Sequence, residues 1–573
     1  MKPLILSLAL ALLVAAPAEL RAEVPAGTDV STLNAAGNRE KQYRHRVMRA
    51  YRPLTYINKR LKVGNYSRYE NPTGIWFTAG ETARIKLKAA APVEAYLKSF
   101  AKDGKETTFV LQPGDNSLRM EHDGLLYINY RADDPAAAPP IELDIAGGKV
   151  NGVFTRHDDN NTWKALVAKA VAPNLDCVGE RCQLLLDMDN VREFVPEDGV
   201  SMLRNYDRII EIQQKDILGW DQYKLHPGNH IMGRVMYDRF MHADGLGAAF
   251  VNTHMGPIIN PETMLRQSWP IAHEFGHVNQ TRPVMMWTGM TEVTNNIFSA
   301  LAQFKLSPSF LRLEHEKGRT PDGYTLRGSR YDSYVNSAIV RKQMWQFQAG
   351  PDDGNRPVDG SKPGDPFVIC ISYWQLYLYL TAARGNDMFY PDLFEMARNT
   401  DATNMTMGEL RTLFYVNACK AAKLDLTDFF VATKMLTPMN RMVGDYSSTY
   451  VTVTPQMIQE AMSQVKAAHY PKPDSKVIYY INGNNYNIYR SKAKLVPSPE
   501  FKPEVRDRRF VVPAGTWKNA VAFEAYAGKQ LLRISLLGLD HEDNVSTTVI
   551  VPEEADSVKA VQWDGKRETI WKK

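Results

Sequence analysis

The chain has 573 residues, of which 44% are hydrophobic and 23% charged, and its formal net charge is +5. This is ordinary globular composition, which excludes collagen-like chains, disordered chains and polytopic membrane proteins. The 69 basic and 64 acidic residues form no basic stripe, so we predict no nucleic-acid partner. A single hydrophobic core rarely extends over this length, so several domains are expected.

The N-terminal segment, residues 1–22, has the pattern of a secretory signal peptide. Lys2 precedes an apolar run from Leu4 to Ala16, and small residues suitable for cleavage follow. An uncleaved membrane anchor is the less favoured alternative, because a span takes about 20 apolar residues. The best later run, Ile371 to Ala383, is interrupted by Gln375 and also too short. We therefore expect an exported protein, periplasmic or extracellular, with no membrane span.

The segment after the signal divides into a lead-in, residues 23–70, and a β-rich part, residues 71–155. Ile85 and Leu87 alternate with charged residues, as in a half-buried strand, and Ile141, Leu143 and Ile145 alternate in the same way. Asp123-Gly124 between two apolar runs predicts a hairpin. Together these patterns predict an N-terminal β-sandwich.

Helical spacing dominates residues 156–473, with short strand candidates at Cys182 to Met188 and Ala248 to Thr253. A stretch rich in Gly, Asp and Pro, residues 351–366, predicts a surface loop. Residues 474–573 return to β patterns, with strand candidates at 477–480, 510–512, 531–537 and 547–551. The expected fold class is multidomain α+β: a β-sandwich, a mainly helical domain and a C-terminal module that is similar to a β-sandwich.

The four cysteines fit an exported protein. Cys177 and Cys182 bracket a four-residue loop that an oxidising compartment would allow a disulfide to close. Cys370 and Cys419 are either buried free thiols or a second bridge, and the sequence leaves this pairing open.

One short motif carries chemistry: His273-Glu274-Phe275-Gly276-His277. On a helix, residues i and i+4 share a face, so both imidazoles reach one metal ion. Glu274 then lies where it can accept the proton of a metal-bound water and pass it to a leaving amine. Gly276 leaves room for another element to approach this helix. The alternative is a solvated polar helix face.

A catalytic zinc needs a third protein ligand and an open fourth position. Glu292 begins a second predicted helix, on which polar and apolar residues form separate stripes. We therefore predict that one Zn²⁺ is held by His273, His277 and Glu292, with Asn296 receiving a ring N–H from a ligand histidine. The alternative for Glu292 is a carboxylate favoured at a helix start by the helix dipole.

At this point the sequence resembles the enhancin-like zinc metallopeptidase family, family M sixty, whose members include mucin-degrading enzymes. The resemblance rests on the His273–His277 motif, Gln280, Trp287 and the run from Glu292 to Ser299, and it extends less specifically from Pro72 to Asp445. It implies a gluzincin catalytic domain over residues 156–473 with the same ligands and base. After Met241-His242-Ala243 the chain departs from the family's usual continuation, so no transition-state donor is carried over from that region.

Three further residues are candidates for transition-state or substrate contacts. His254 and Tyr373 have side chains that can donate to an oxyanion. The indole of Trp287 offers a flat apolar face for a sugar. For each of them, packing in the core or in a loop is the alternative.

The function predicted from the sequence is a secreted zinc endopeptidase that cleaves O-glycosylated, mucin-like proteins. The peptidase chemistry follows from the ligand set, whereas the glycoprotein preference comes only from the resemblance. One alternative is a gluzincin peptidase with no glycan requirement. Another is a glycan-binding or adhesion protein with a vestigial metal site.

Overall fold

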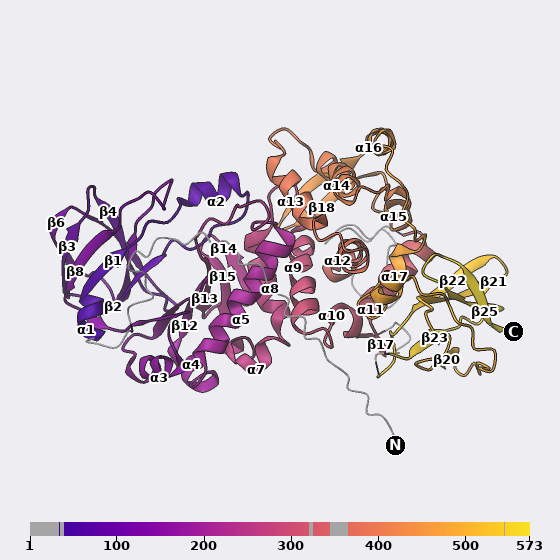
Figure 1. Ribbon diagram of the computed structural model, residues 1–573, viewed down its shortest axis with the longest axis horizontal. Helices are drawn as coiled ribbons and strands as arrows, with labels where there is room; N and C mark the ends of the chain where they lie inside the picture. Colours follow the sequence, from indigo (N-terminus) through magenta and orange to yellow (C-terminus); the bar gives the residue numbers. More distant parts are fainter. Residues whose placement is uncertain (1–33, 35–38, 320–324, 344–364, 544) are drawn as a thin grey trace, which may run out of the picture.

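The computed structural model describes residues 34, 39–319, 325–343, 365–543 and 545–573. The predicted signal peptide and most of the predicted loop at 351–366 lie outside these residues. The chain forms three successive parts (Figure 1): β-sheets near the N-terminus, a mixed central part, and further sheets near the C-terminus.

Two antiparallel sheets make up the N-terminal part. One has the order β1 (His45–Met48), β8 (Ile141–Ala146), β3 (Thr82–Lys88) and β6 (Gly114–Arg119). The other has the order β5 (Glu106–Leu111), β4 (Val93–Lys98), β7 (Gly124–Asn129), β2 (Asn71–Phe77) and β9 (Lys149–Val150). Apolar side chains from both sheets form one core, among them Ile85, Leu87 and Leu143, so the predicted alternation is confirmed.

The predicted hairpin around Asp123-Gly124 is wrong. β6 pairs with β3, whereas β7 pairs with β2 and β4, so the turn connects the two sheets instead of joining neighbouring strands. Two apolar runs flanking a turn bury their side chains equally well by packing face to face across a sandwich, and the local sequence does not distinguish this from a hairpin.

A six-stranded mixed sheet forms the base of the central part. Its order is β10 (Val153–Thr155), β11 (Asn174–Val178), β12 (Cys182–Asp187), β13 (Ile231–Met236), β15 (Gly247–Val251) and β14 (His242–Asp244). The strands predicted near 182 and 248 are confirmed. The prediction of a mainly helical domain, however, underestimated the number of strands in this region. Its inner strands are buried on both faces, so their sequences lack the alternation that marks a half-exposed strand.

Helices pack on one face of this sheet and extend beyond it (Figure 1), whereas sandwich side chains such as Tyr127 pack against Leu185 and Met232 on its other face. The two that matter most here are α8 (Ser268–Asn279) and α9 (Thr291–Leu306), which pack against each other next to β14 and β15. The other α-helices are α1 (Arg39–Arg44), α2 (Leu54–Arg60), α3 (Asn160–Lys169), α4 (Met188–Phe194), α5 (Gly199–Ile212), α6 (Gly256–Ile259), α7 (Pro261–Met264), α10 (Arg312–His315), α11 (Ser329–Tyr334), α12 (Pro366–Leu376), α13 (Phe389–Asn399), α14 (Met407–Ala422), α15 (Thr427–Ala432), α16 (Pro455–Ala467) and α17 (Tyr486–Ser491).

One helix is longer than the apolar run Ile371 to Ala383 that the sequence predicts to be too short for a membrane span. α12 continues through the π-helical turn η5 (Tyr377–Ala383), and the combined helix Pro366–Ala383 has the length and composition of a membrane span. However, 72% of that window is buried inside the protein, where it packs against α9 and α11. This is the environment of a core helix.

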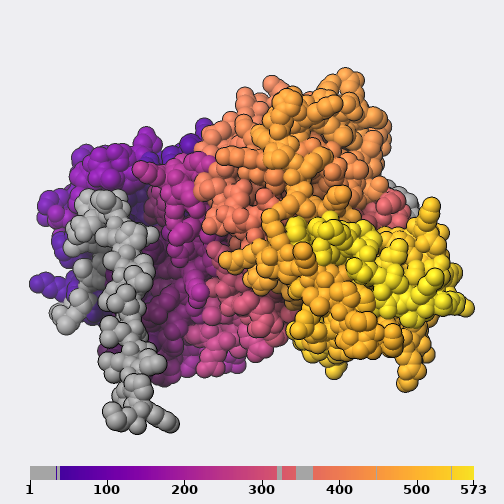
Figure 2. All heavy atoms as spheres, turned by 45° about the vertical axis from the view of Figure 1, so that its right-hand side comes forward, coloured from indigo at the N-terminus to yellow at the C-terminus, as the bar shows by residue number. Residues whose placement is uncertain are grey.

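The C-terminal part contains a four-stranded sheet, β22 (Gln530–Leu536), β21 (Ala522–Ala527), β24 (Ser557–Val561) and β25 (Arg567–Lys572), and a pair, β20 (Arg509–Val512) with β23 (Thr547–Ile550). The strand expected at 477–480 is instead a short 3₁₀ helix, η6 (Ile478–Tyr480). This part packs closely on the central helices (Figure 2), where Arg533 donates to both oxygens of Asp332 at 2.6 and 2.7 Å.

The proposed disulfide between Cys177 and Cys182 is absent from the structure, where both are buried free thiols. In the β11–β12 pair Cys177 lies opposite Leu184, so Cys182 is only its diagonal neighbour. Diagonal residues are about 7–8 Å apart, beyond the usual Cα separation of bridged cysteines. Cys370 and Cys419 are also buried free thiols.

A buried carboxyl group links the sandwich to the central sheet. Asp176 on β11 accepts hydrogen bonds from Tyr127 on β7 at 2.9 Å and from Gln183 on β12 at 3.0 Å. Burial raises the pKa of Asp176 to about 7, against the opposing effect of these two hydrogen bonds. The folded state therefore retains a proton that the unfolded chain releases near pH 4.

We expect the stability contribution of Asp176 to be complete below about pH 4 and to be lost as the pH rises to about 7, with a slope of up to about 1.4 kcal/mol per pH unit. Asp176→Asn removes the titration. Between pH 5 and pH 7 the Tm of the wild type should fall relative to that of the variant, and the difference should stop changing by pH 8. A difference that stays constant over this range would contradict the assigned pKa.

Candidate metal centre

The motif His273 to His277 lies in the middle of α8, where nearly every side chain is buried. The two histidines are one turn apart, and their ring centroids are separated by 4.7 Å. Because α8 is covered on its other faces by the sheet and by neighbouring helices, the imidazoles are held on the one face that borders a cavity.

Glu292 reaches the two histidines because α8 and α9 approach unusually closely. A Cβ added to Gly276 would lie 2.8 Å from the backbone oxygen of Asn295, so only glycine fits there. The approach brings Glu292 Oε2 to 3.1 Å from His273 Nε2 and 3.3 Å from His277 Nε2. Ligands of a tetrahedral zinc site are separated by about 3.3 Å, given bonds of about 2.0–2.1 Å.

Two side-chain amides set the orientation of the imidazoles. Asn296 Oδ1 lies 2.9 Å from His273 Nδ1, the contact expected for Asn296, and Gln280 Oε1 lies 3.2 Å from His277 Nδ1. Both amide nitrogens donate to backbone carbonyls, of Glu292 and Thr291 respectively, which leaves the amide oxygens facing the rings. Because Nδ1 of each ring faces an acceptor oxygen, a neutral imidazole keeps its proton on Nδ1 and leaves Nε2 as the atom that can bind a metal ion.

Asn295, which was not predicted as a site residue, lies within hydrogen-bond distance of both ligand nitrogens. Its amide nitrogen is 3.0 Å from His277 Nε2 and 3.2 Å from His273 Nε2. The two Nε2 atoms also lie close to Glu292 Oε2, so two ring nitrogens and a carboxylate oxygen converge at this place. One ligand atom from each of His273, His277 and Glu292 lies within 4.8 Å of the others, so the donor set fits a metal ion.

Glu274 is placed as a base. Its side chain is 5% exposed, and among the described residues none forms a hydrogen bond with its Oε2. Burial raises the pKa of Glu274, while the neighbouring histidines oppose this effect. An unpaired buried carboxylate oxygen beside a metal site is suited to hold a water molecule.

The pKa of the third ligand, Glu292, is lowered, whereas that of Glu274 is raised. Burial would raise the pKa of Glu292, but hydrogen bonds from His273 and His277 outweigh it, and the pKa lies well below its usual range. Burial would lower the pKa of His273, yet its hydrogen bond with Glu292 raises it overall. The two groups therefore stabilise each other's charged forms.

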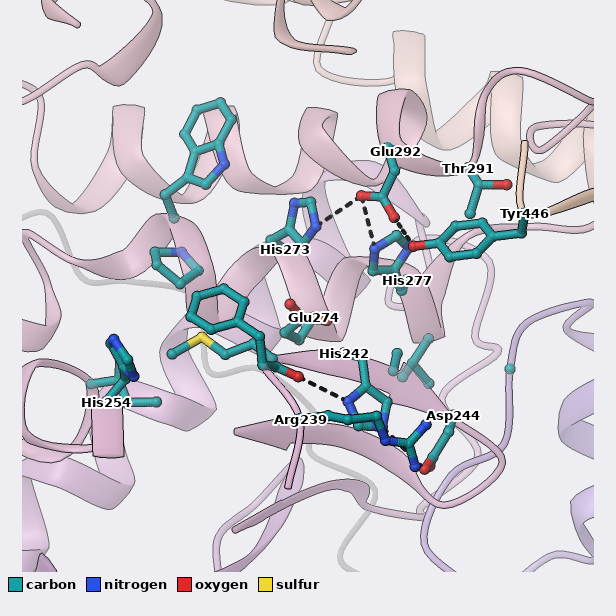
Figure 3. A pocket seen from close by; sticks show the side chains of 18 of the residues that line it. Arg239, His242, Asp244, His254, His273, Glu274, His277, Thr291, Glu292 and Tyr446 are labelled. Carbon is teal, nitrogen blue, oxygen red and sulfur yellow. Dashed lines mark hydrogen bonds and ion pairs between the residues drawn. The ribbon is translucent and has the colours of Figure 1, made fainter. Parts of the chain in front are cut away.

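The ligands border a cavity of about 1010 Å³ (Figure 3), whose lining comes from several elements. α8 contributes Trp269 and the motif residues, the edge strand β14 and the loop before it contribute residues 239–245, and Tyr446 enters from the other side. Asp244, which lines the cavity, forms an ion pair at 2.5 Å with Arg234 of β13, a residue outside the lining. Phe240 is 67% exposed, and its ring packs edge-on against His254.

The three further candidates lie in different places. His254 lines the cavity, but Figure 3 shows it well apart from the metal ligands. Tyr373 is buried on α12 against Phe414, and Trp287 is buried against the same phenylalanine. Neither lines the cavity, so the structure does not bring the candidate oxyanion donor Tyr373 or the candidate sugar platform Trp287 to the metal centre. Both are aromatic residues in a core, the alternative weighed from the sequence.

The sequence reading missed Tyr446, whose hydroxyl donates to Glu292 Oε1 (Figure 3). Tyr446 is 154 residues from Glu292 along the chain, and no motif surrounds it. No local signal marks such a residue, because only the folding of a distant hairpin brings it to the site.

Peptide hydrolysis at a helix of this type needs a metal held by three side chains and a base next to it. The described geometry provides both, which places the protein in the class of metallopeptidases. Residues 153–434 match the family model of peptidase M60, enhancin and enhancin-like, and this part of the chain belongs to that family.

Several solved structures similar to this chain are described as metallopeptidases. A metallopeptidase in complex with Tn antigen is 24% identical, with a TM-score of 0.71, covering 92% of this chain and 99% of the other. A metallopeptidase from Bacteroides thetaiotaomicron is 23% identical, with a TM-score of 0.71, covering 92% and 90%. The M60 catalytic domain of ZmpC from Clostridium perfringens, in complex with the sialyl T antigen, is 16% identical, with a TM-score of 0.61, covering 91% and 99%. The comparison with curated proteins gives no match.

The close approach at Gly276 generates a prediction about metal affinity. Gly276→Ala should push α9 away from α8 and weaken zinc binding by about 10- to 100-fold, the range found when groups that hold metal ligands are disturbed. Chelator competition measures this. Gly245→Ala, whose added Cβ would have its nearest neighbour at 3.8 Å, is the control and should bind like wild type. Equal affinity in both variants would show that helix spacing does not determine the site.

Proposed function

We propose that this protein is an exported zinc endopeptidase that hydrolyses peptide bonds in O-glycosylated, mucin-like proteins. The observation that carries the proposal is the convergence of His273, His277 and Glu292 on one point, beside the unpaired carboxylate oxygen of Glu274. Two imidazoles and a carboxylate are a donor set typical of catalytic zinc, and one ion suffices for it.

The side chains divide the chemistry between them. A zinc ion held by the three ligands supplies a Lewis acid for the scissile carbonyl and lowers the pKa of water. Glu274 takes the proton from the attacking water and delivers it to the leaving amine. Asn296 and Gln280 hold the two imidazoles in the required tautomer throughout. Because Glu274 has no other described partner at Oε2, its carboxylate is free for this proton transfer.

The choice of a glycosylated substrate is supported by the cavity and by the similar structures. A volume of about 1010 Å³ is at the upper end for ligand sites, which leaves room for a large substrate group. Exposed Phe240 and the half-buried Arg312, whose guanidinium lies 5.4 Å from the Trp269 ring, offer apolar and polar contacts together. Two of the similar metallopeptidases are complexes with the Tn and sialyl T antigens. Export is supported by the signal-like N-terminal sequence.

Substitution of the base tests the mechanism. Glu274→Gln should retain zinc with unchanged stoichiometry but lose at least about a hundredfold in kcat, because the amide cannot accept the proton. Glu262→Gln, an exposed carboxylate on α7 outside the cavity lining, is the matched control and should cleave like wild type. Cleavage of an O-glycoprotein by Glu274→Gln at the wild-type rate would contradict the assigned role.

Removal of the sugars tests the substrate class. One defined O-glycoprotein is digested before and after enzymatic removal of its O-glycans, and fragments are identified by mass spectrometry. We expect cleavage next to glycosylated Ser or Thr and a large loss of cleavage after deglycosylation. Undiminished cutting of the bare protein would instead identify a peptidase with no glycan requirement. Glycan binding without turnover in the presence of zinc would identify an adhesion protein with a vestigial site.

A further inference from the structure

The hairpin formed by β18 (Met439–Asp445) and β19 (Ser447–Val453) ends at the metal centre, although it belongs to neither α8 nor α9. Asp445 pairs with Ser447, so Tyr446 alone forms the tip. Its φ of 51° lies in the left-handed region, which a bulky side chain rarely adopts. Such backbone persists only where surrounding contacts impose it, and it is concentrated at functional sites.

Asp445 supplies those contacts by holding the hairpin to the start of α9. Its Oδ2 accepts hydrogen bonds from the backbone of Gly289 at 2.8 Å and from the backbone and hydroxyl of Thr291 at 3.1 and 2.8 Å. α9 has no side-chain cap of its own, so the hairpin caps it from outside. Asp445 binds Thr291, the first residue of α9. Tyr446 follows Asp445 and Glu292 follows Thr291, so these two residues are brought into contact.

The two oxygens of the Glu292 carboxylate have different surroundings as a result (Figure 3). Oε2 faces the histidines, at 3.1 Å from His273 Nε2 and 3.3 Å from His277 Nε2. Oε1 is turned to the hairpin and accepts the hydroxyl of Tyr446. A carboxylate that ligates a metal is commonly held by such an outer hydrogen bond.

We propose that Tyr446 is a positioning residue that keeps Glu292 a one-oxygen ligand of the metal, with Oε2 toward the ion and Oε1 bound to the phenol. The inference rests on the proposed zinc site. By occupying Oε1, the phenol prevents the carboxylate from rotating to offer both oxygens, and it leaves a coordination position for water or substrate. Asp445 contributes by anchoring the tip to α9.

The test uses the full chain with Tyr446→Phe and the matched control Tyr450→Phe. Tyr450 is also exposed on this hairpin, but among the described residues its hydroxyl donates to the hairpin's own Asn440 carbonyl, at 3.4 Å, and not to a metal ligand. Two quantities are measured: the zinc dissociation constant by chelator competition, and the visible absorption spectrum of the Co²⁺-substituted protein, which reports coordination number and geometry. Tyr446→Phe should weaken zinc binding about 10- to 100-fold and shift the Co²⁺ bands, whereas Tyr450→Phe should match wild type.

A third variant, Asp445→Ala, should reproduce both changes in part, because the tip loses its anchor. Unchanged zinc affinity and an unchanged Co²⁺ spectrum in Tyr446→Phe would overturn the inference, and a loss of kcat alone would then identify Tyr446 as a substrate contact. These outcomes differ from failure of the proposed function, in which wild type itself neither binds zinc at this site nor cleaves a protein.

Discussion

The spacing between α8 and α9 is the constraint on which the metal centre depends. The helices approach until the backbone of Asn295 meets Gly276, at a distance that leaves no room for a side chain. At this spacing a carboxylate from the first turn of α9 reaches both imidazoles of α8. A wider gap would separate the Glu292 carboxylate from the two imidazoles, and these largely buried groups would lose the contacts that stabilise their charged forms.

Much of the surrounding structure acts to hold this spacing and the charges within it. Gln280, at the end of α8, bonds both to His277 and to backbone and side-chain groups at the start of α9. Asp445 closes the same helix start from the distant hairpin. Asp445 and Glu292 both place negative charge at the N-terminal end of α9, where the helix dipole favours it by about 0.3–1 kcal/mol for each group. The site is therefore cross-linked by polar contacts between three separate segments.

Outside the metal centre, local sequence patterns predicted some strands and turns but not how the strands pair. The alternation at Ile85 and Leu87 predicted a sandwich strand, because one face of the strand is exposed to solvent and the other is buried. Of the inner strands of the central sheet, β12 and β15 were predicted, but β13 was missed, since it is buried on both faces and lacks the alternation of a half-exposed strand. The turn at Asp123-Gly124 was recognised, but its strands were assigned to one sheet instead of two. Cys177 and Cys182 were close in sequence, yet the strand register places Cys177 opposite Leu184.

Helical periodicity alone was enough to bring together the i, i+4 histidines, the base between them and the room left by Gly276. It also indicated Glu292 and Asn296, since the stripes of a second helix restrict which residues face the first. The distant groups that complete the site became visible only in the folded chain. The fold places Tyr373 and Trp287 in the core instead of at the metal centre, and it brings in Tyr446. The physical reason is that helical periodicity extends over a few turns, whereas contacts across 154 residues depend on how separate elements pack.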